Sequence, residues 1–477
     1  MVIILVVFLI IFALLLICFI RSISLKPTDA VNATIEAKAD ERANAYGEKL
    51  GTMLRCETIS NIDDPSKEKF LKFHVVLENL FPEIHKTCEK HVFDGSLLFK
   101  WAGNQKKEPI MFMSHFDVVE ATGEWTHEPF SGKIIDNKVW GRGAVDTKGN
   151  LFCIMQSIEE LIKEGYQPQQ DIYIASSCTE EISGNGASIT ANYLRKNKVM
   201  LKFIMDEGGM IMEKPIAGLE GIYGLVGLVE KGYGDLKFIA RGKGGHSSAP
   251  PKNTPMARLA AFINEAENKQ LFKVHLNATT AEMFKRFTPN MKFSMKFILG
   301  NLWLFKPLFL KIVPSLNDSL AAMVKTTLTF TMAKGSDGYN VIPQEAFVVG
   351  NLRFSGHQPT QESIQIMTEL AKKYDIETEV LKTHDPSPEG SYSSDAFKLL
   401  ETTMNEIYPG VDVVPYAMTG GTDCKFYTEV AETILRFAPL YIDQQQFSSI
   451  HGLDENMDIA TLSKGVDFYK TLIKKYE

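Results

Sequence analysis

Short apolar runs in this chain repeatedly end at acidic or histidine residues, and this pattern constrains the fold more than any other feature. The segments in question are residues 114–117, 143–146, 179–181, 205–207 and 450–452. Residues 110–113, 171–175 and 201–205 are strand-like, and residues 151–162 carry apolar side chains at helical spacing. Strands that alternate with helices predict a mostly parallel α/β sheet. In such sheets, ligands bind at the carboxyl ends of the strands, where these polar residues stand.

The same segments supply side chains that suit a pair of divalent metal ions. Each segment offers one ligand, which makes two histidines and three carboxylates in all. Zn²⁺ prefers such ligands, although Co²⁺ or Mn²⁺ could occupy them as well. One spare glutamate beside a ligand could serve as the base that a metal-activated water requires. The pattern therefore indicates a metal-dependent hydrolase.

Composition excludes several other classes of protein. The 477 residues are 45% hydrophobic and 23% charged, which indicates a globular protein of more than one domain. The formal net charge is −7 and no long run of Lys or Arg occurs, which argues against a nucleic-acid-binding protein. The six cysteines include no CxxC pair, which argues against a disulfide scaffold or a cysteine zinc site.

Residues 2–20 are apolar without interruption, which is long enough to cross a bilayer. No Lys or Arg precedes them and no small-residue cleavage site follows. We therefore expect residues 1–21 to be an uncleaved single-pass anchor rather than a signal peptide. If the segment were cleaved as a signal peptide, the enzyme would be secreted. Arg21 and Lys26 favour a cytoplasmic enzyme, but two charges leave the side of the membrane open. The polar residues 22–40 are expected to form a juxtamembrane linker.

A second region interrupts the first. Strand-like and helical segments alternate at residues 235–240, 255–268, 326–332, 348–354, 362–374 and 376–381. This β-α-β-β-α-β order predicts a ferredoxin-like α+β domain inserted into the first, as a lid or dimerisation domain. We therefore assign the catalytic domain to residues 41–231 and 385–477, and the inserted domain to residues 232–384.

Residues 270–325 form an aromatic-rich insertion within the second region. The aromatic residues are Phe272, Phe284, Phe287, Phe293, Phe297, Trp303, Phe305 and Phe309. Three interpretations are open. These side chains could line a groove for a long acyl chain, lie against the membrane near the anchor, or form the core of a helical pair.

Taken together, the motifs resemble those of the aminoacylase/carboxypeptidase S family of zinc hydrolases, peptidase family M20. The resemblance covers nearly everything after residue 40. It rests on His115-x-Asp117, Gly141-Arg142-Gly143, Asp146-Thr147-Lys148-Gly149, Glu180-Glu181, Asp206-Glu207-Gly208-Gly209, Gly245-His246-Ser247-Ser248 and His451-Gly452. Residues 302–308 and 340–343 make the chain most similar to the N-fatty-acyl-amino-acid synthase/hydrolase and carboxypeptidase S branch.

The resemblance implies a role for each residue of the metal site. His115, Asp146 and Asp206 would hold one zinc ion. Glu181 and His451 would hold the other, with Asp146 bridging both ions. Asp117 would orient His115 through its second ring nitrogen. Glu180 would take a proton from the metal-bridging water and deliver it to the leaving amine.

The resemblance also implies residues that contact the substrate. His246 of the inserted domain would stabilise the tetrahedral oxyanion, often across a dimer. Asn340 and Arg353 would bind the substrate, with Arg353 gripping a free α-carboxylate, although an ordinary surface ion pair is the alternative for Arg353. The backbone N–H groups of Gly420, Gly421 and Thr422 could bind the same carboxylate. The alternative is that this loop is an ordinary turn.

The predicted function is that of a dinuclear zinc amidohydrolase acting on N-acyl-amino acids or C-terminally free peptides. Because condensation is the reverse reaction, high concentrations of amine and acid could drive synthesis. One alternative is a dipeptidase or aminopeptidase on the same scaffold. Another is a catalytically inactive binding protein, which the presence of Glu180 and of every metal ligand disfavours.

Overall fold

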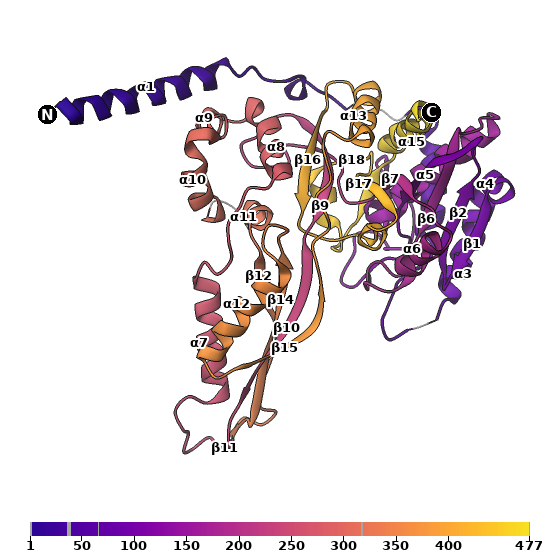
Figure 1. Cartoon of the computed structure of the whole chain (residues 1–477). Helices are drawn as coiled ribbons and strands as arrows, with labels where there is room; N and C mark the ends of the chain where they lie inside the picture. Colours follow the sequence, from indigo (N-terminus) through magenta and orange to yellow (C-terminus); the bar gives the residue numbers. More distant parts are fainter. Residues whose placement is uncertain (1, 36–39, 65, 316–317, 477) are drawn as a thin grey trace.

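The computed structural model describes residues 2–35, 40–64, 66–315 and 318–476. A main domain, corresponding to the predicted catalytic domain, carries a smaller inserted domain that projects from it (Figure 1). The N-terminal helix α1 (Val2–Ser24) extends away from both domains. Among the described residues, α1 is the one straight helix long and apolar enough to cross a membrane.

The main domain is built on a ten-stranded sheet whose central strands are parallel. Its order is β1-β2-β6-β3-β7-β17-β9-β8-β18, with β16 paired to β9. Strand β3 (Gln105–Met113) runs parallel between β6 (Gln170–Ser176) and β7 (Leu201–Asp206), and β17 (Ala431–Arg436) continues the parallel set beyond β7. This arrangement confirms the predicted α/β fold.

The remaining elements of the main domain complete this sheet and cover it. The other strands of the sheet are β1 (Glu89–Phe93), β2 (Ser96–Trp101), β8 (Ile211–Glu213), β9 (Ile222–Glu230), β16 (Asp412–Met418) and β18 (Tyr441–Ile442). A small separate sheet contains β4 (Ile134–Ile135), β5 (Lys138–Trp140) and β19 (Asn456–Asp458). The helices are α2 (Ala43–Leu54), α3 (Glu68–Leu80), α4 (Pro82–Thr87), α5 (Gly149–Lys163), α6 (Gly186–Lys196), α13 (Asp395–Ile407), α14 (Gln444–Ser449) and α15 (Ile459–Lys475).

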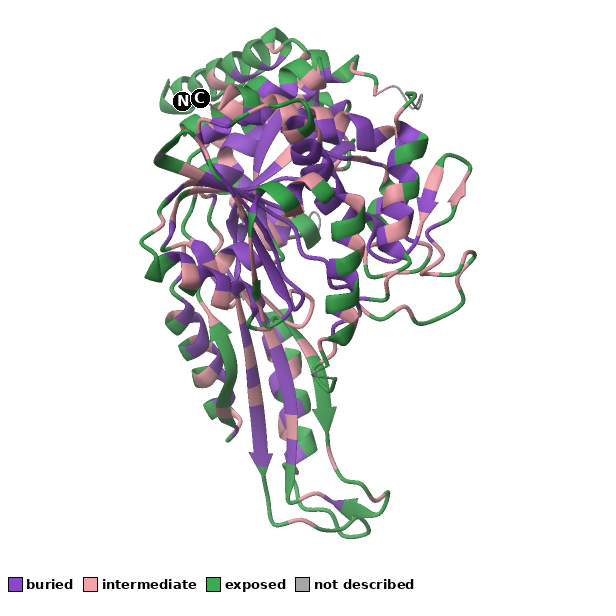
Figure 2. Cartoon of the chain, turned by 90° about the vertical axis from the view of Figure 1, so that its right-hand side faces the viewer, coloured by how far each residue is buried: buried purple, intermediate pink, exposed green. Residues whose placement is uncertain are grey.

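Helices cover both faces of the sheet centre, which explains why its strands are continuous apolar runs. In β3, Ile110 and Phe112 pack in the core that includes α5 and α15, whereas Met111 and Met113 pack on the other face with α6. Strands β6 and β7 and the last four residues of β3 are therefore almost wholly buried (Figure 2).

The inserted domain has the predicted β-α-β-β-α-β order. Its elements are β10 (Gly232–Arg241), α7 (Pro255–Asn268), β12 (Thr327–Lys334), β14 (Glu345–Phe354), α12 (Thr360–Lys373) and β15 (Glu377–His384). Its antiparallel sheet has the order β12-β14-β10-β15, which is that of a ferredoxin-like domain. Helix α7 begins at the predicted residue because Thr254 caps its N-terminus and Pro255 occupies its first turn.

The aromatic insertion folds as four helices outside the ferredoxin-like sheet: α8 (Ala278–Phe287), α9 (Phe293–Leu299), α10 (Leu302–Ile312) and α11 (Asp318–Val324). Helix α8 packs on β16 of the main domain. Phe284, Phe287 and Phe309 are buried there, in a core shared with Tyr223 and Val414. Core packing therefore accounts for part of the insertion, whereas Phe293 and Trp303 remain exposed.

The segment after α1, which we predicted to be a linker, lies against the aromatic insertion and the main domain as far as residue 35. The backbone N–H of Thr28 donates to Asn290 Oδ1 at 2.9 Å, and Asn290 Nδ2 donates back to Thr28 Oγ1 at 2.6 Å. Ala30 is fully buried beside Gly221 of the main domain. Residues 36–39 of the predicted linker lie outside the described residues.

Lys231 forms hydrogen bonds at the junction of the two domains. It stands between β9 and β10, and its Nζ donates to the carbonyls of Ala322 and Lys325, at 3.0 and 2.8 Å, and to Thr327 Oγ1 at 3.2 Å. Burial, together with the nearby charges of Arg353 and Lys325, lowers the pKa of Lys231 to about 7. Folding therefore favours release of the proton from this side chain.

We expect the free energy of unfolding to rise with pH because of Lys231. The lysine pKa is about 7 in the folded protein, against an ordinary 10.5. The full cost of burying the charge thus applies below pH 7 and is relieved as the pH rises towards 10.5. In urea denaturation, wild type should gain about 1.4 kcal/mol per pH unit over Lys231→Met between pH 7 and 9. A difference that stays constant with pH would contradict this expectation.

Candidate metal centre and active site

The loops that follow the central parallel strands bring the predicted ligands together. His115 follows β3, Glu180 and Glu181 follow β6, and Asp206 ends β7. Because these strands are parallel neighbours, their carboxyl ends meet at one edge of the sheet.

The Asp146 carboxylate lies between the two predicted histidine ligands. His115 Nε2 is 3.1 Å from Asp146 Oδ1, and His451 Nε2 is 3.0 Å from Asp146 Oδ2. His451 Nε2 is also 3.0 Å from Glu181 Oε2. Ligand atoms of His115, Asp146 and Glu181 all lie within 4.8 Å of one another. Four of the five predicted ligands therefore converge, with Asp146 placed as a bridging carboxylate would be.

Glu181 provides a direct test of whether these residues fit a metal ion. Its Oε1 is buried and accepts no hydrogen bond from the part of the chain that the structure describes. An unpaired carboxylate oxygen in a protein interior is costly unless a cation or a donor satisfies it. The Glu181 carboxylate belongs to a cluster of imidazole and carboxylate groups, so the donor set fits Zn²⁺ or a similar ion.

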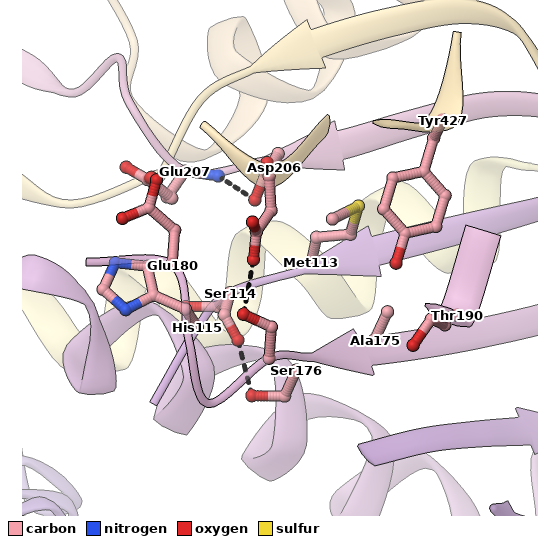
Figure 3. A pocket seen from close by; sticks show the side chains of 12 residues that line it. Met113, Ser114, His115, Ala175, Ser176, Glu180, Thr190, Asp206, Glu207 and Tyr427 are labelled. Carbon is pink, nitrogen blue, oxygen red and sulfur yellow. Dashed lines mark hydrogen bonds between the residues drawn. The ribbon is translucent and has the colours of Figure 1, made fainter. Parts of the chain in front are cut away.

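Asp206, the fifth predicted ligand, lines a small cavity beside this cluster. Its Oδ1 accepts the backbone N–H of Glu207 at 2.9 Å, and its Oδ2 accepts that of Cys424 at 3.1 Å. The cavity measures about 10 Å³, which is enough for one water molecule. Figure 3 shows His115, Glu180 and Glu207 together on one side of it.

Asp117 supports both His115 and the Glu pair. His115 Nδ1 lies 2.9 Å from the Asp117 carbonyl oxygen and 3.5 Å from its Oδ1. The two carboxylate oxygens of Asp117 accept the backbone N–H groups of Glu180 and Glu181, each at 3.1 Å. This one buried side chain therefore fixes the start of the loop that carries the candidate base and a candidate ligand.

The carboxylates repel one another in this buried space, and their pKa values reflect it. Burial raises the pKa of Glu180 and of Glu207 well above the usual range, and nearby carboxylates add to the effect. Burial also raises the pKa of Glu181 and of Asp206. In Asp146 burial acts in the same direction, but hydrogen bonds from the two histidines lower its pKa. Bound cations would relieve the remaining repulsion.

Glu455 is a supporting residue that the sequence analysis did not identify. Its Oε1 accepts the backbone N–H groups of Val145 and Asp146 at 2.8 and 3.0 Å. Its Oε2 accepts the backbone N–H of Gly143 at 2.9 Å and an N–H of the Arg142 guanidinium at 2.8 Å. The carboxylate thereby holds the backbone that presents Asp146. No sequence motif surrounds Glu455. The sequence analysis identified only the segment that Glu455 contacts, Gly141-Arg142-Gly143.

A second buried carboxylate, Glu230, organises the loop of residues 420–424. Its Oε1 accepts hydrogen bonds from Arg436 Nε at 2.7 Å and from the backbone N–H and hydroxyl of Thr422 at 3.0 and 2.7 Å. The Thr422 amide is therefore engaged inside the protein and does not face a substrate. Gly420 and Gly421 adjoin open space, so this part of the loop remains accessible.

The structure does not bring His246 to the metal cluster within one chain. Strand β11 (Gly245–His246) pairs with β13 (Val341–Ile342) at the far tip of the inserted domain, away from β6 and β7 (Figure 1). His246 is exposed there, with its Nδ1 2.8 Å from Ser248 Oγ. Asn340 shares the tip, since its carbonyl accepts the N–H of Ser247 at 3.0 Å.

Arg353 lies at the other end of the inserted domain from the tip. It stands on β14 opposite Tyr233, at the end of the inserted domain that adjoins the main domain. Its guanidinium carbon lies 4.7 Å from the centre of the Tyr233 ring, and its Nε donates to Asn351 Oδ1 at 3.3 Å. The geometry is that of a cation held over an aromatic face rather than of a surface ion pair.

Comparisons with known proteins agree with the site. The sequence profile of peptidase family M20/M25/M40 matches residues 111–475. A protein of Dictyostelium discoideum named probable carboxypeptidase S-like 2 is 33% identical over 422 residues, which cover 87% of this chain and 81% of that protein. The N-fatty-acyl-amino acid synthase/hydrolase PM20D1 of Xenopus tropicalis is 32% identical over 444 residues, covering 91% and 86%.

Solved structures show the same fold. The crystal structure of the M20 family metallo-carboxypeptidase Sso-CP2 from Sulfolobus solfataricus superposes with a TM-score of 0.67 at 18% identity, covering 92% of this chain and 99% of that one. The family match and the relatives above 30% identity confirm the resemblance noted in the sequence. The chain therefore belongs to peptidase family M20/M25/M40, as a hydrolase of the carboxypeptidase and aminoacylase type.

Proposed function

We propose that this protein is a dinuclear zinc amidohydrolase that cleaves N-acyl-amino acids or C-terminally free peptides. The observation that carries the proposal is the Asp146 carboxylate, which has one oxygen facing His115 and the other facing His451. Family membership supports hydrolysis of an amide bond. The names of the relatives, which refer to N-fatty-acyl-amino acids and to carboxypeptidase S, support the substrate class.

Each ion would have its own set of ligands, with Asp146 shared between the two. His115 and Asp206 would complete one set, and Glu181 and His451 the other. When bound, a zinc pair lowers the pKa of water and polarises the scissile carbonyl. The unpaired Oε1 of Glu181 and the raised pKa of Asp206 support this assignment, because both carboxylates lack sufficient positive partners.

Glu180 is the residue that we propose moves the proton. Its carboxylate borders the cavity that His115 and Asp206 also line, and Asp117 fixes its backbone. Burial keeps its pKa well above the usual range for a glutamate, nearer to the pH at which the enzyme would work. The carboxylate would accept a proton from the attacking water and donate it to the nitrogen of the leaving amine.

The Glu180→Gln variant should keep its metal ions and lose activity, since the amide cannot accept the proton. The turnover number should fall by roughly 10²–10⁴-fold, with an unchanged zinc content by mass spectrometry. Glu429→Gln is the matched control, because Glu429 is an exposed glutamate on the same domain. A Glu180→Gln protein with two zinc ions and full activity would exclude Glu180 as the base.

The position of His246 leads us to propose a homodimer through the inserted domain. At an exposed tip far from their own cluster, His246 and Asn340 are placed to reach a substrate in the site of a second copy. His246 would then stabilise the oxyanion there.

His246→Ala and Glu180→Gln proteins should each be inactive alone and regain activity when mixed, because one site of the mixed dimer has both residues. Failure to complement would show that His246 acts within its own chain or not at all.

Glu455 should set the affinity of the site for zinc without contacting the ion. In Glu455→Gln, the new NH₂ group faces backbone N–H donors, so the loop that carries Asp146 loses its support. We expect the zinc Kd, measured by competition with a chelator, to rise about 10–100-fold. Glu159→Gln is the matched control, since Glu159 is also buried and accepts the backbone N–H groups of Glu83 and Ile84. An equal effect of both variants would reduce the role of Glu455 to general stability.

The substrate class can be tested on the zinc-loaded protein by following release of the free amino acid. N-acyl-amino acids should be cleaved, and the same compounds with an amide in place of the free carboxylate should react at least tenfold more slowly. The reason is that a cation or a backbone N–H group of the protein would bind the carboxylate. Dipeptides with a free amine are the competing substrates. A requirement for that free amine would favour the dipeptidase or aminopeptidase alternative. No cleavage at all with both ions bound would indicate a non-catalytic member of the family.

A further inference from the structure

Helix α1 is attached to the aromatic insertion by one stripe of its surface. Most of α1 is exposed and apolar, but Cys18 and Ser22 are fully buried against α9 and α10. These residues lie one helical turn apart, on the same face of α1. The rest of the helix continues outward beyond α9 and α10 (Figure 1).

Asn301, the residue between α9 and α10, forms the centre of this attachment. It is fully buried, and its side-chain NH₂ donates to the Cys18 carbonyl and to Ser22 Oγ, each at 3.1 Å. The rings of Phe19 and Phe293 meet edge to face at 5.7 Å. Loss of α1 would remove two of the three acceptors of this NH₂ group and leave only the Phe297 carbonyl, at 2.9 Å. The contacts therefore support an α1 that is retained in the mature protein.

The outer surface of α9 and α10 combines large apolar side chains with positive charge. Phe293, Trp303 and Leu308 are 48%, 55% and 50% exposed. Residues 291–313 contain four lysines and no acidic residue, in a chain whose net charge is −7. None of the four forms an ion pair with another described residue: Lys292, Lys296, Lys306 and Lys311. A surface of exposed aromatic residues and lysines is typical of a membrane interface.

From these observations, we propose that α9, α10 and the C-terminal half of α1 form a lipid-binding face that seats the enzyme on an anionic bilayer. Helix α1 would span the membrane. Helix α10 has 11 residues and a length of about 16 Å, which is too short to span a core of about 30 Å. It runs across the direction of α1 and is bent by 109° from α9, so it would lie in the plane of the interface (Figure 1).

Two features favour a bilayer over the other occupants of this face. The face is continuous with α1, whose own exposed apolar surface requires lipid. Its unpaired lysines would repel the same face of a second copy but attract anionic headgroups. The exposed side chains also account for the part of the aromatic insertion that core packing does not.

The proposal is testable through Trp303, one of four tryptophans in the chain. The full-length protein is placed in phosphatidylcholine nanodiscs with or without phosphatidylserine, and tryptophan emission is quenched by lipids that carry the quencher near the headgroup or near the chain end. We expect stronger quenching by the headgroup-proximal label. Trp303→Phe should lose most of it, whereas Trp125→Phe, which changes a tryptophan of the main domain, should retain it. Equal quenching in both variants would overturn the proposal.

The charge of the face is tested in the same nanodiscs. Quenching of wild type should increase with phosphatidylserine and decrease with salt. Lys306→Gln/Lys311→Gln should abolish that increase, whereas the equally exposed pair Lys196→Gln/Lys198→Gln should not. No dependence on phosphatidylserine would overturn the anionic preference. A Trp303 shielded from lipid in a disc that holds two chains would assign the face to a second copy instead.

The intact mass of the membrane-purified protein provides an independent check, because the proposal requires α1 to be present. A mature chain that lacks residues 2–24 would overturn it. None of these measurements depends on catalysis, so their failure would not affect the proposed amidohydrolase activity.

Discussion

The crowding of carboxylates at one edge of the sheet is the constraint on which the rest of the structure depends. An ionised carboxylate in a protein interior costs several kcal/mol unless charges or hydrogen bonds compensate it. Backbone N–H groups compensate Glu455 and Asp117, a guanidinium compensates Glu230, and two imidazoles face Asp146. The charge that remains, above all on Glu181, is the charge that we propose the metal ions neutralise. The loops between strands follow from this requirement, because each one delivers either a carboxylate or a partner for one.

Much of the fold could be predicted because its signals are local. Apolar strands that end at histidine or acidic residues predicted the parallel sheet, and the order of strands and helices predicted the ferredoxin-like insertion. The supporting carboxylates could not be found in this way. Glu455 contacts a backbone segment 309 to 312 residues earlier in the chain, and nothing in its own neighbourhood indicates that contact. Likewise, the distance of His246 from the cluster depends on how far the inserted domain projects, which no local pattern encodes.

The aromatic insertion shows the same limit for surfaces. Its composition indicated that it would pack against something, but not which side chains would be buried. Phe284 and Phe309 joined the core beside β16, whereas Trp303 remained outside because it lies on another face of α10 than Phe309. The polar segment after α1 was expected to be a simple linker. Its long-range hydrogen bonds between Thr28 and Asn290 instead fix the direction in which α1 leaves the protein.

The Glu455 network has a consequence for how the enzyme matures. Because hydrogen bonds to the protein's own backbone and to Arg142 hold the loop that carries Asp146, the loop does not need a cation to reach its shape. The polypeptide can therefore complete its folding before it acquires the metal ions that we propose. Stripping the ions should silence the enzyme without denaturing it, and returning them should restore it without a chaperone. The cell could then control this enzyme through metal supply, independently of how much protein it makes.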